Sequence, residues 1–74
     1  MFHYHLLKEI LYSDELGEYI SFGIQVTNQR GDKVASVSDI STKQDYVEEL
    51  CRLFNKNNLS PLHLRDVIED MLLV

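Results

Sequence analysis

The sequence predicts an α+β fold in which a three-stranded antiparallel β-meander is followed by two α-helices packed on one face of the sheet, in the order βββαα. Apolar residues alternate with a period of two in the first half of the chain and recur every three or four positions thereafter. The segments between the expected elements are short, which suits hairpins and leaves no long crossover for a parallel sheet. At 74 residues the chain is expected to be one small domain, 1–74, near the lower size limit for a core without disulfides or metal.

The first segment, residues 2–12, fits two patterns. Helical spacing is met by Leu6, Leu7, Ile10 and Leu11. A period of two is met by Phe2, Tyr4, Leu6, Ile10 and Tyr12. The aromatic enrichment, and the turn sequence SDELGE that leads into a clear strand, favour a strand here.

Two further strands are expected. In residues 18–29 the core side is formed by Ile20, Phe22, Ile24 and Val26. A hairpin turn follows, because Asn28, Gly31 and Asp32 tolerate the tight or left-handed backbone that such a turn needs. Residues 34–41 then form a shorter strand whose apolar side changes parity near Ser38 and Asp39, as at a bulge or a strand end.

The first helix is expected to begin near Ser41. Ser41 with Gln44 has the spacing of a capping box, and Thr42 with Asp45 is a competing register. Its inward face would be Tyr46, Val47, Leu50, Cys51, Leu53 and Phe54. The sequence NKNN ends it, with an asparagine able to take the left-handed position after the last turn.

The second helix begins in the sequence LSPLHL. Ser60 is expected to be its N-cap and Pro61 its first residue, with Leu59 and Leu64 at the spacing of a hydrophobic staple. One apolar stripe would then contain Leu64, Val67, Ile68, Met71 and Leu72. The residues off this stripe are His63, Arg65, Asp66, Glu69 and Asp70.

Charge and composition narrow the classes of function. Seven basic and twelve acidic residues give a net charge of -5, which repels the phosphate backbone of nucleic acids. The single cysteine cannot form an internal disulfide, and there is neither a secretion signal nor an apolar run long enough to cross a membrane. We therefore expect a soluble, cytoplasmic protein that binds neither nucleic acid nor membrane.

Several stretches resemble a known family. They are YHLLKEIL, ISFGIQV, VSDIS running into a helix, and LSPLHLRDVIEDML. Together they resemble the small proteins of Gram-positive anaerobes that are catalogued as domain of unknown function 6514, and the likeness spans nearly the whole chain. Its most specific part is SPLHLRDVIED, with the proline and the pairs Arg65-Asp66 and Glu69-Asp70. The resemblance supports a strand at the N terminus, but it implies no activity and no site residues, because that family has no assigned function.

Individual residues that could carry chemistry have structural explanations. His3 and His5 share one side of the first strand, with Glu9 farther along, and these are zinc or nickel ligand types; a closed zinc site needs four ligands, so metal binding is only a third hypothesis. Cys51 is expected to fill the core. The integrin-type tripeptide Arg30-Gly31-Asp32 is expected to be a hairpin tip.

No enzyme activity and no cofactor are expected. The sequence contains no glycine-rich phosphate loop, no serine–histidine–acid set and no acid pair at catalytic spacing. A chain of this size also has little room for a substrate pocket.

The sequence instead favours a small interaction or regulatory module. Two helices on one face leave the other face of the sheet, and its edges, free to dock a protein partner or a second copy in a homodimer. That face would show Met1, His3, His5, Leu7, Leu11, Tyr19, Ser21 and Gly23. The alternative is an acidic mimic that binds a basic protein surface through Glu48, Glu49, Asp66, Glu69 and Asp70.

Overall fold

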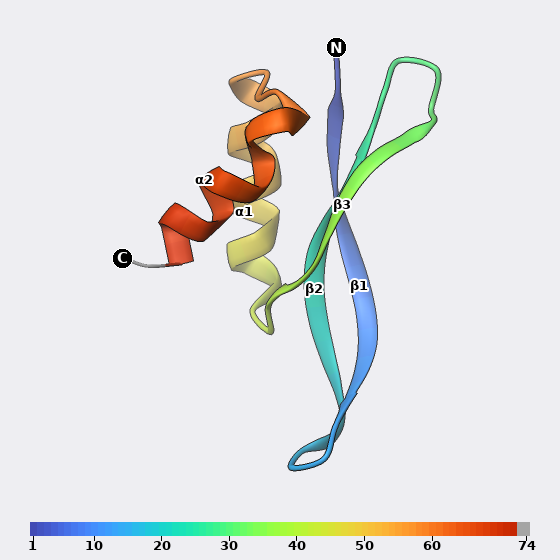
Figure 1. Cartoon of the computed structure of the whole chain (residues 1–74), viewed down its shortest axis with the longest axis vertical. Helices are drawn as coiled ribbons and strands as arrows, with labels where there is room; N and C mark the ends of the chain where they lie inside the picture. The colour runs from blue at the N-terminus through green and yellow to red at the C-terminus, as the bar shows by residue number, and fades with distance from the viewer. Residues whose placement is uncertain (73–74) are drawn as a thin grey trace.

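A computed structural model describes residues 1–72 of the chain, the side chain of Leu72 excepted. Its elements are β1 (His3–Ser13), β2 (Gly17–Thr27), β3 (Lys33–Ser41), α1 (Gln44–Lys56), a 3-10 turn (Pro61–His63) and α2 (Leu64–Leu72). The strands form one antiparallel sheet in the order β1-β2-β3, and both helices lie in a layer on one side of it (Figure 1). The predicted βββαα fold is therefore confirmed, including a strand at the ambiguous N-terminal segment.

β1 and β2 form a long hairpin in unbroken register, from His3 opposite Thr27 to Ser13 opposite Gly17. At its tip the hydroxyl of Ser13 accepts hydrogen bonds from the backbone N–H groups of Glu15 (3.2 Å) and Leu16 (3.1 Å). Gly17 closes the turn with φ +72°, a conformation that glycine adopts without a steric cost. The SDELGE segment is thus the predicted turn.

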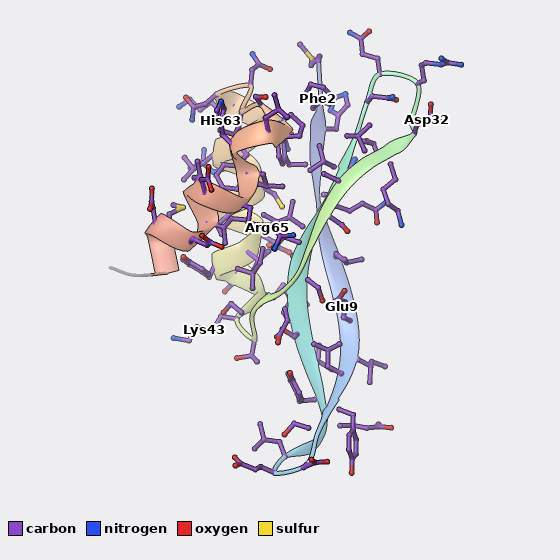
Figure 2. The ribbon with its side chains drawn as sticks, in the orientation of Figure 1. Phe2, Glu9, Asp32, Lys43, His63 and Arg65 are labelled. Carbon is purple, nitrogen blue, oxygen red and sulfur yellow. The ribbon has the colours of Figure 1, made fainter. Side chains whose placement is uncertain are left out.

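The turn between β2 and β3 is organised by Asn28. Its side-chain oxygen accepts from the N–H groups of Arg30 (2.9 Å) and Asp32 (3.0 Å), and its backbone oxygen accepts from Gly31 (3.0 Å). Arg30, Gly31 and Asp32 therefore form the hairpin tip that the sequence predicts. Asp32 and Phe2 lie at the end of the molecule opposite the β1–β2 tip (Figure 2).

β3 contains a wide bulge. Val37 pairs with Ile24, but the next paired residue of β2, Phe22, lies opposite Ser41, so β3 has two extra residues here. Asp39 adopts φ +54° within the bulge. The parity change predicted near Ser38 and Asp39 is confirmed.

The predicted capping box at the start of α1 is wrong in both registers. The N-cap is Lys43, which makes no side-chain cap, and the hydroxyl of Ser41 accepts instead from the N–H of Lys43 (3.0 Å). Ser41 cannot cap the helix because it is still the last residue of β3, paired with Phe22. The predicted end of the helix is confirmed: Asn58 has φ +50°, and the N–H of Leu59 donates to the carbonyl of Phe54 (3.1 Å).

The second helix begins through a tighter turn than the sequence predicts. Ser60 caps it, since its hydroxyl accepts from the N–H of Leu62 (3.4 Å), and Pro61 is the first helical residue. Residues 61–63 are wound as a 3-10 turn, and α2 itself begins at Leu64.

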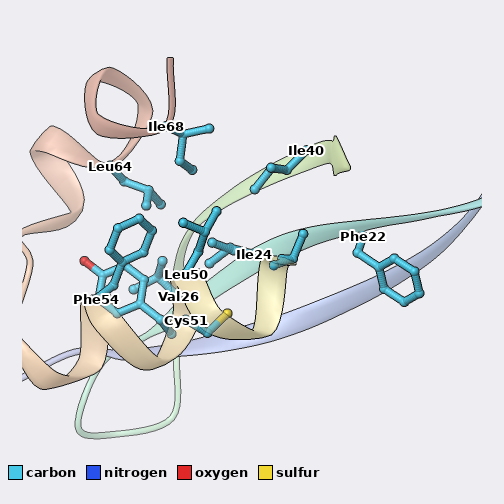
Figure 3. Packing of buried hydrophobic residues seen from close by; sticks show 11 residues of the cluster. Phe22, Ile24, Val26, Ile40, Leu50, Cys51, Phe54, Leu64 and Ile68 are labelled. Atoms are coloured by element: carbon cyan, nitrogen blue, oxygen red, sulfur yellow. The ribbon is translucent and has the colours of Figure 1, made fainter. Parts of the chain in front are cut away.

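The core lies between the sheet and the helices (Figure 3). Its buried side chains are Tyr4, Phe22, Ile24, Val26, Ile40, Val47, Leu50, Cys51, Phe54, Leu64 and Ile68. Tyr4 joins the layers, because its ring packs edge-on against Phe54 with centroids 5.5 Å apart and its hydroxyl donates to the carbonyl of Leu59. Burial raises the pKa of this phenol.

Several predicted core positions need correction or qualification. Ile20 is 47 % exposed, because the helices do not extend over its part of the strand. Tyr46 is exposed rather than inward. Val67 and Met71 of the α2 stripe pack partly buried against the core, whereas the side chain of Leu72 lies outside the described residues.

Candidate interaction surface

The far half of the β1–β2 hairpin projects beyond the rest of the molecule (Figure 1). We call residues 10–20 the arm. β3 reaches only to Phe22 of β2, and the buried core ends there too. The arm is therefore a two-stranded ribbon that the helices do not cover (Figure 1).

Four large apolar side chains are exposed on the arm, and we call them the arm surface. They are Ile10 (71 % exposed), Tyr12 (73 %), Leu16 (73 %) and Ile20 (47 %). Ile10 and Ile20 are directly opposite one another, on the side of the strands that carries the core residues nearer the helices. The sequence pattern predicts the side on which these residues lie, but it does not reveal that the helices stop short of them.

The sheet face away from the helices is less open than the sequence predicts. Leu7, Leu11 and Tyr19 are half-buried there, while Ser21 and Gly23 are buried, which contradicts their expected exposure. The β3 bulge covers Ser21 and Gly23: Ser21 bonds to Asp39, and a Cβ built on Gly23 would lie 2.2 Å from the carbonyl oxygen of Val37. The chain itself thus occupies the middle of the proposed docking face.

Polar groups fasten the bulge to the two longer strands. Glu9 accepts from the hydroxyl of Ser38 (2.5 Å) and the N–H of Asp39 (3.3 Å). Asp39 accepts in turn from the hydroxyls of Ser21 (2.5 Å) and Tyr19 (3.4 Å). Desolvation raises the pKa of the Tyr19 phenol, and the charges of Asp39 and Glu9 raise it further. This network was not predicted, because the five residues are far apart in sequence; Figure 2 marks Glu9 on the sheet.

The outer edge of β1 is closed at one place. The side-chain amide of Asn55, on α1, accepts from the N–H of Tyr4 (2.8 Å) and donates to the Tyr4 carbonyl (3.0 Å). Asn55 thus stands in for a neighbouring strand at this residue. Its role was missed, because nothing local distinguishes it from the other asparagines of NKNN.

The histidines do not converge. His3 and His5 are exposed with ring centroids 6.3 Å apart, and Nε2 of His5 is 2.9 Å from the hydroxyl of Thr27. His63 lies on the 3-10 turn of the helical layer (Figure 2). Within residues 1–72 no group of three or more histidine, cysteine or acidic side chains is placed to hold a metal ion.

Cys51, on α1, is buried in the hydrophobic core, as expected for a residue that only fills space there. Burial, and then the charge of Glu48, raise the pKa of its thiol to about 11. Little thiolate forms near neutral pH, so the residue is poorly suited to nucleophilic chemistry.

The predicted acidic residues divide between two helices. Asp66, Glu69 and Asp70 are exposed on α2, and Glu48 and Glu49 on α1. Arg52 forms an ion pair with Glu49, which lowers the pKa of that carboxyl, and Glu48 accepts from the Gln44 amide (2.8 Å). Both α1 carboxylates therefore have partners within their own helix.

A shallow hollow lies beside the N terminus, near the β2–β3 turn. It measures about 200 Å³ and is lined by Met1, Phe2, Asn28, Gln29 and Arg30. Ligand pockets usually enclose roughly 300–1,000 Å³, and this one is wide open, so it offers little to a small molecule.

Comparison with known proteins places the chain in one group. A model described as "Family of unknown function (DUF6514)" matches residues 1–74. No curated protein and no solved structure matches the chain. Within the described residues no helix is long and apolar enough to cross a membrane.

Proposed function

The chain belongs to the DUF6514 family, whose function is unknown, and from its surface we propose that it is a non-enzymatic protein-interaction module that docks a protein partner through the arm. The observation that carries this proposal is the arm surface, four large apolar side chains exposed outside the core. Following the resemblance noted above, we propose that it acts in the cytoplasm of Gram-positive anaerobes.

Exposure on the arm is hard to explain by folding alone. Each buried side chain of this kind would contribute about 1.5–3 kcal/mol, and here that contribution is not used within the chain. Ile10, Ile20 and Leu16 also lie on a ribbon that the helices leave uncovered (Figure 1). The half-buried Leu7 and Leu11, on the opposite face of β1, extend the contact that a partner could make.

The experiment uses the full chain, tagged at one end and expressed in its native cell. After chemical crosslinking, the partners recovered with the natural chain are compared with those of an Ile10→Glu/Ile20→Glu variant. Both substitutions lie outside the core, so the variant should keep its Tm within a few degrees. We expect the partner to be lost, because two desolvated carboxylates cannot be accommodated in an apolar contact.

Leu62→Glu is the matched control. Leu62 is 88 % exposed on the 3-10 turn, and its substitution changes charge and surface apolarity without touching the arm. The control should keep the partner. Equal recovery with the arm variant and with the control would refute the proposal.

The acidic mimic is the second candidate, supported by the exposure of Asp66, Glu69 and Asp70 on α2. The partners of Glu48 and Glu49 within α1 weaken it. Salt separates the two candidates, since exposed charges are screened over about 8–10 Å at moderate ionic strength. Binding that survives a rise in salt supports the arm, whereas steep loss supports the mimic.

A further inference from the structure

We propose that the partner of the arm is a second copy of this chain, joined edge to edge through antiparallel pairing of β1 with β1 of the other copy, with Ile10 of each copy at the two-fold axis. This inference rests on the proposed function and names the occupant of that surface. It would create a continuous six-stranded sheet, β3-β2-β1-β1-β2-β3.

Every second residue of β1 directs its backbone N–H and carbonyl groups away from β2. Tyr4 turns its N–H and carbonyl outward, because both bind Asn55 rather than β2. In an antiparallel strand every second residue has this orientation, and the register between β1 and β2 is unbroken. Lys8, Ile10 and Tyr12 therefore direct their N–H and carbonyl groups away from the sheet.

This edge of β1 is open. Within residues 1–72, hydrogen bonds from outside the sheet reach the β1 backbone at one residue, Tyr4. Both of these bonds are made by Asn55. An unpaired edge of this length, flanked by exposed Ile10 and Tyr12, is a template for an added strand. An added strand would satisfy the backbone and place its own side chains beside Ile10 and Tyr12.

The β1 edge suits a second copy of the same chain, because it is complementary to itself in one register. Centring the two-fold axis on Lys8 or on Glu9 would set like charges directly opposite, which is unfavourable. Centring it on Ile10 sets Lys8 opposite Tyr12 of the other copy and Glu9 opposite its Leu11. The Lys8 ammonium then lies beside an aromatic ring, an attractive arrangement.

The same register also fits the length of the edge. It pairs the outward-facing residues Lys8, Ile10 and Tyr12, whereas an axis at Leu11 would pair only Ile10 and Tyr12 within the strand. Ser13, the last residue of β1, would lie opposite Leu7 of the other copy. The added strand therefore ends before it reaches Tyr4, and the Asn55 contact stays in place.

The first test measures the mass of the purified full chain by sedimentation over the micromolar to millimolar range. We expect a reversible dimer. Ile10→Pro removes the central N–H donor at a position where an edge strand tolerates proline, and it should raise the dissociation constant about 100-fold. A natural chain that stays monomeric over this range overturns the inference.

Ile20→Pro is the matched control. Ile20 lies directly across the hairpin from Ile10, and because β3 ends opposite Phe22, its N–H faces the other edge of the arm. The control should dimerise like the natural chain. Dimers that survive Ile10→Pro, or that fail equally in both variants, would exclude pairing through the β1 edge.

A disulfide tests the register without relying on proline. Residues paired at the axis have Cα atoms about 5.5 Å apart, within disulfide range, so Ile10→Cys should form a covalent dimer on mild oxidation. Tyr12→Cys should not, because its two copies would lie four residues apart along the strands. The buried Cys51 remains in both variants as a slow internal reference. Faster crosslinking through Tyr12→Cys would overturn the register.

The two proposals can fail separately. A monomeric natural chain whose cellular partner is still lost with Ile10→Glu/Ile20→Glu would overturn the dimer and leave the interaction module standing. If the Ile10→Glu/Ile20→Glu variant kept both the dimer and the cellular partner, both proposals would be overturned.

Discussion

At the scale of single residues, Gly23 explains why β3 can cross the sheet as closely as it does. The carbonyl of Val37 occupies the space that a Cβ would need, and it is part of the backbone, so it cannot swing aside like a flexible side chain. Without this close approach, Ser38 and Asp39 would not reach Glu9 and Ser21.

We predict that Gly23→Ala destabilises the protein by about 1–3 kcal/mol, since the added methyl overpacks a rigid contact. Urea unfolding followed by circular dichroism measures the change. Ser36→Ala, at a neighbouring exposed position on β3, should shift the free energy of unfolding by no more than about 0.5 kcal/mol. Equal effects of the two substitutions would contradict the close packing of β3 on Gly23.

Cys51 gives a pH dependence with a defined sign. The pKa of the thiol is raised from 9.0 to about 11 in the folded chain, so the folded state disfavours the thiolate. The stabilisation that the protonated thiol gives to the fold is complete below pH 9 and is lost as the pH rises toward 11.

Unfolding measured across this pH range should therefore show a loss of stability that is smaller in Cys51→Ala. The comparison is needed because the pKa of Tyr4 is raised as well. Ionisation of that phenol therefore lowers the stability of both proteins as the pH rises. Parallel pH profiles for the two proteins would contradict the assignment to the thiol.

At the scale of elements, the orientation of each strand and helix could be predicted from sequence because it is a local property. Alternation in β2 gives the side on which Ile20 lies, but not its exposure, which depends on where α1 begins in space (Figures 1 and 2). The missed capping of α1 has a similar origin: Ser41 has the right spacing for a cap but is held in the sheet by Phe22. The arm surface and the bulge network arise from packing between distant segments, which local spacing does not encode.

The contact between α1 and β1 is the clearest example. Asn55 and Tyr4 are 51 positions apart, and two hydrogen bonds join them. We predict that Asn55→Ala lowers the free energy of unfolding by about 1–3 kcal/mol, at about 0.5–1.5 kcal/mol for each bond. The Tyr4 amide should also lose protection in hydrogen exchange.

Asn57→Ala is the control for this substitution. Asn57 lies two residues along, and its side chain donates to the Leu53 carbonyl within the same helix (2.8 Å). It should leave the protection of the Tyr4 amide unchanged. Normal protection of that amide in Asn55→Ala would show that Asn55 does not hold the strand.

At the scale of the whole molecule, the fold divides into a packed body and an arm. The buried core contains residues from β1, β2, β3 and both helices, and none of its members lies between residues 8 and 20. The body therefore accounts for folding, and the arm is available for another purpose.

We predict that the chain folds when residues 10–20 are replaced by Asn-Gly. Glu9 and Ser21 are opposite one another with their backbone groups turned inward, the pair that a two-residue hairpin turn requires. The loss should be below about 4 kcal/mol, since each cross-strand pair that is removed contributes about 0.2–1 kcal/mol.

Calorimetry and a two-dimensional NMR spectrum would check this shortened chain. Core resonances such as those of Ile24, Val47 and Leu64 should keep their positions. Global unfolding would show that the arm is a structural part of the domain, which would remove the argument that its exposed side chains serve a partner.

The bond from the Tyr4 hydroxyl to the Leu59 carbonyl joins residues that are 55 positions apart. Tyr4 is therefore synthesised well before the residue that anchors it. Until the helices have been synthesised, the apolar face of the nascent sheet is exposed to solvent, and contacts of such long sequence separation form slowly. We expect a chaperone that shields this side during translation to raise the yield of folded protein.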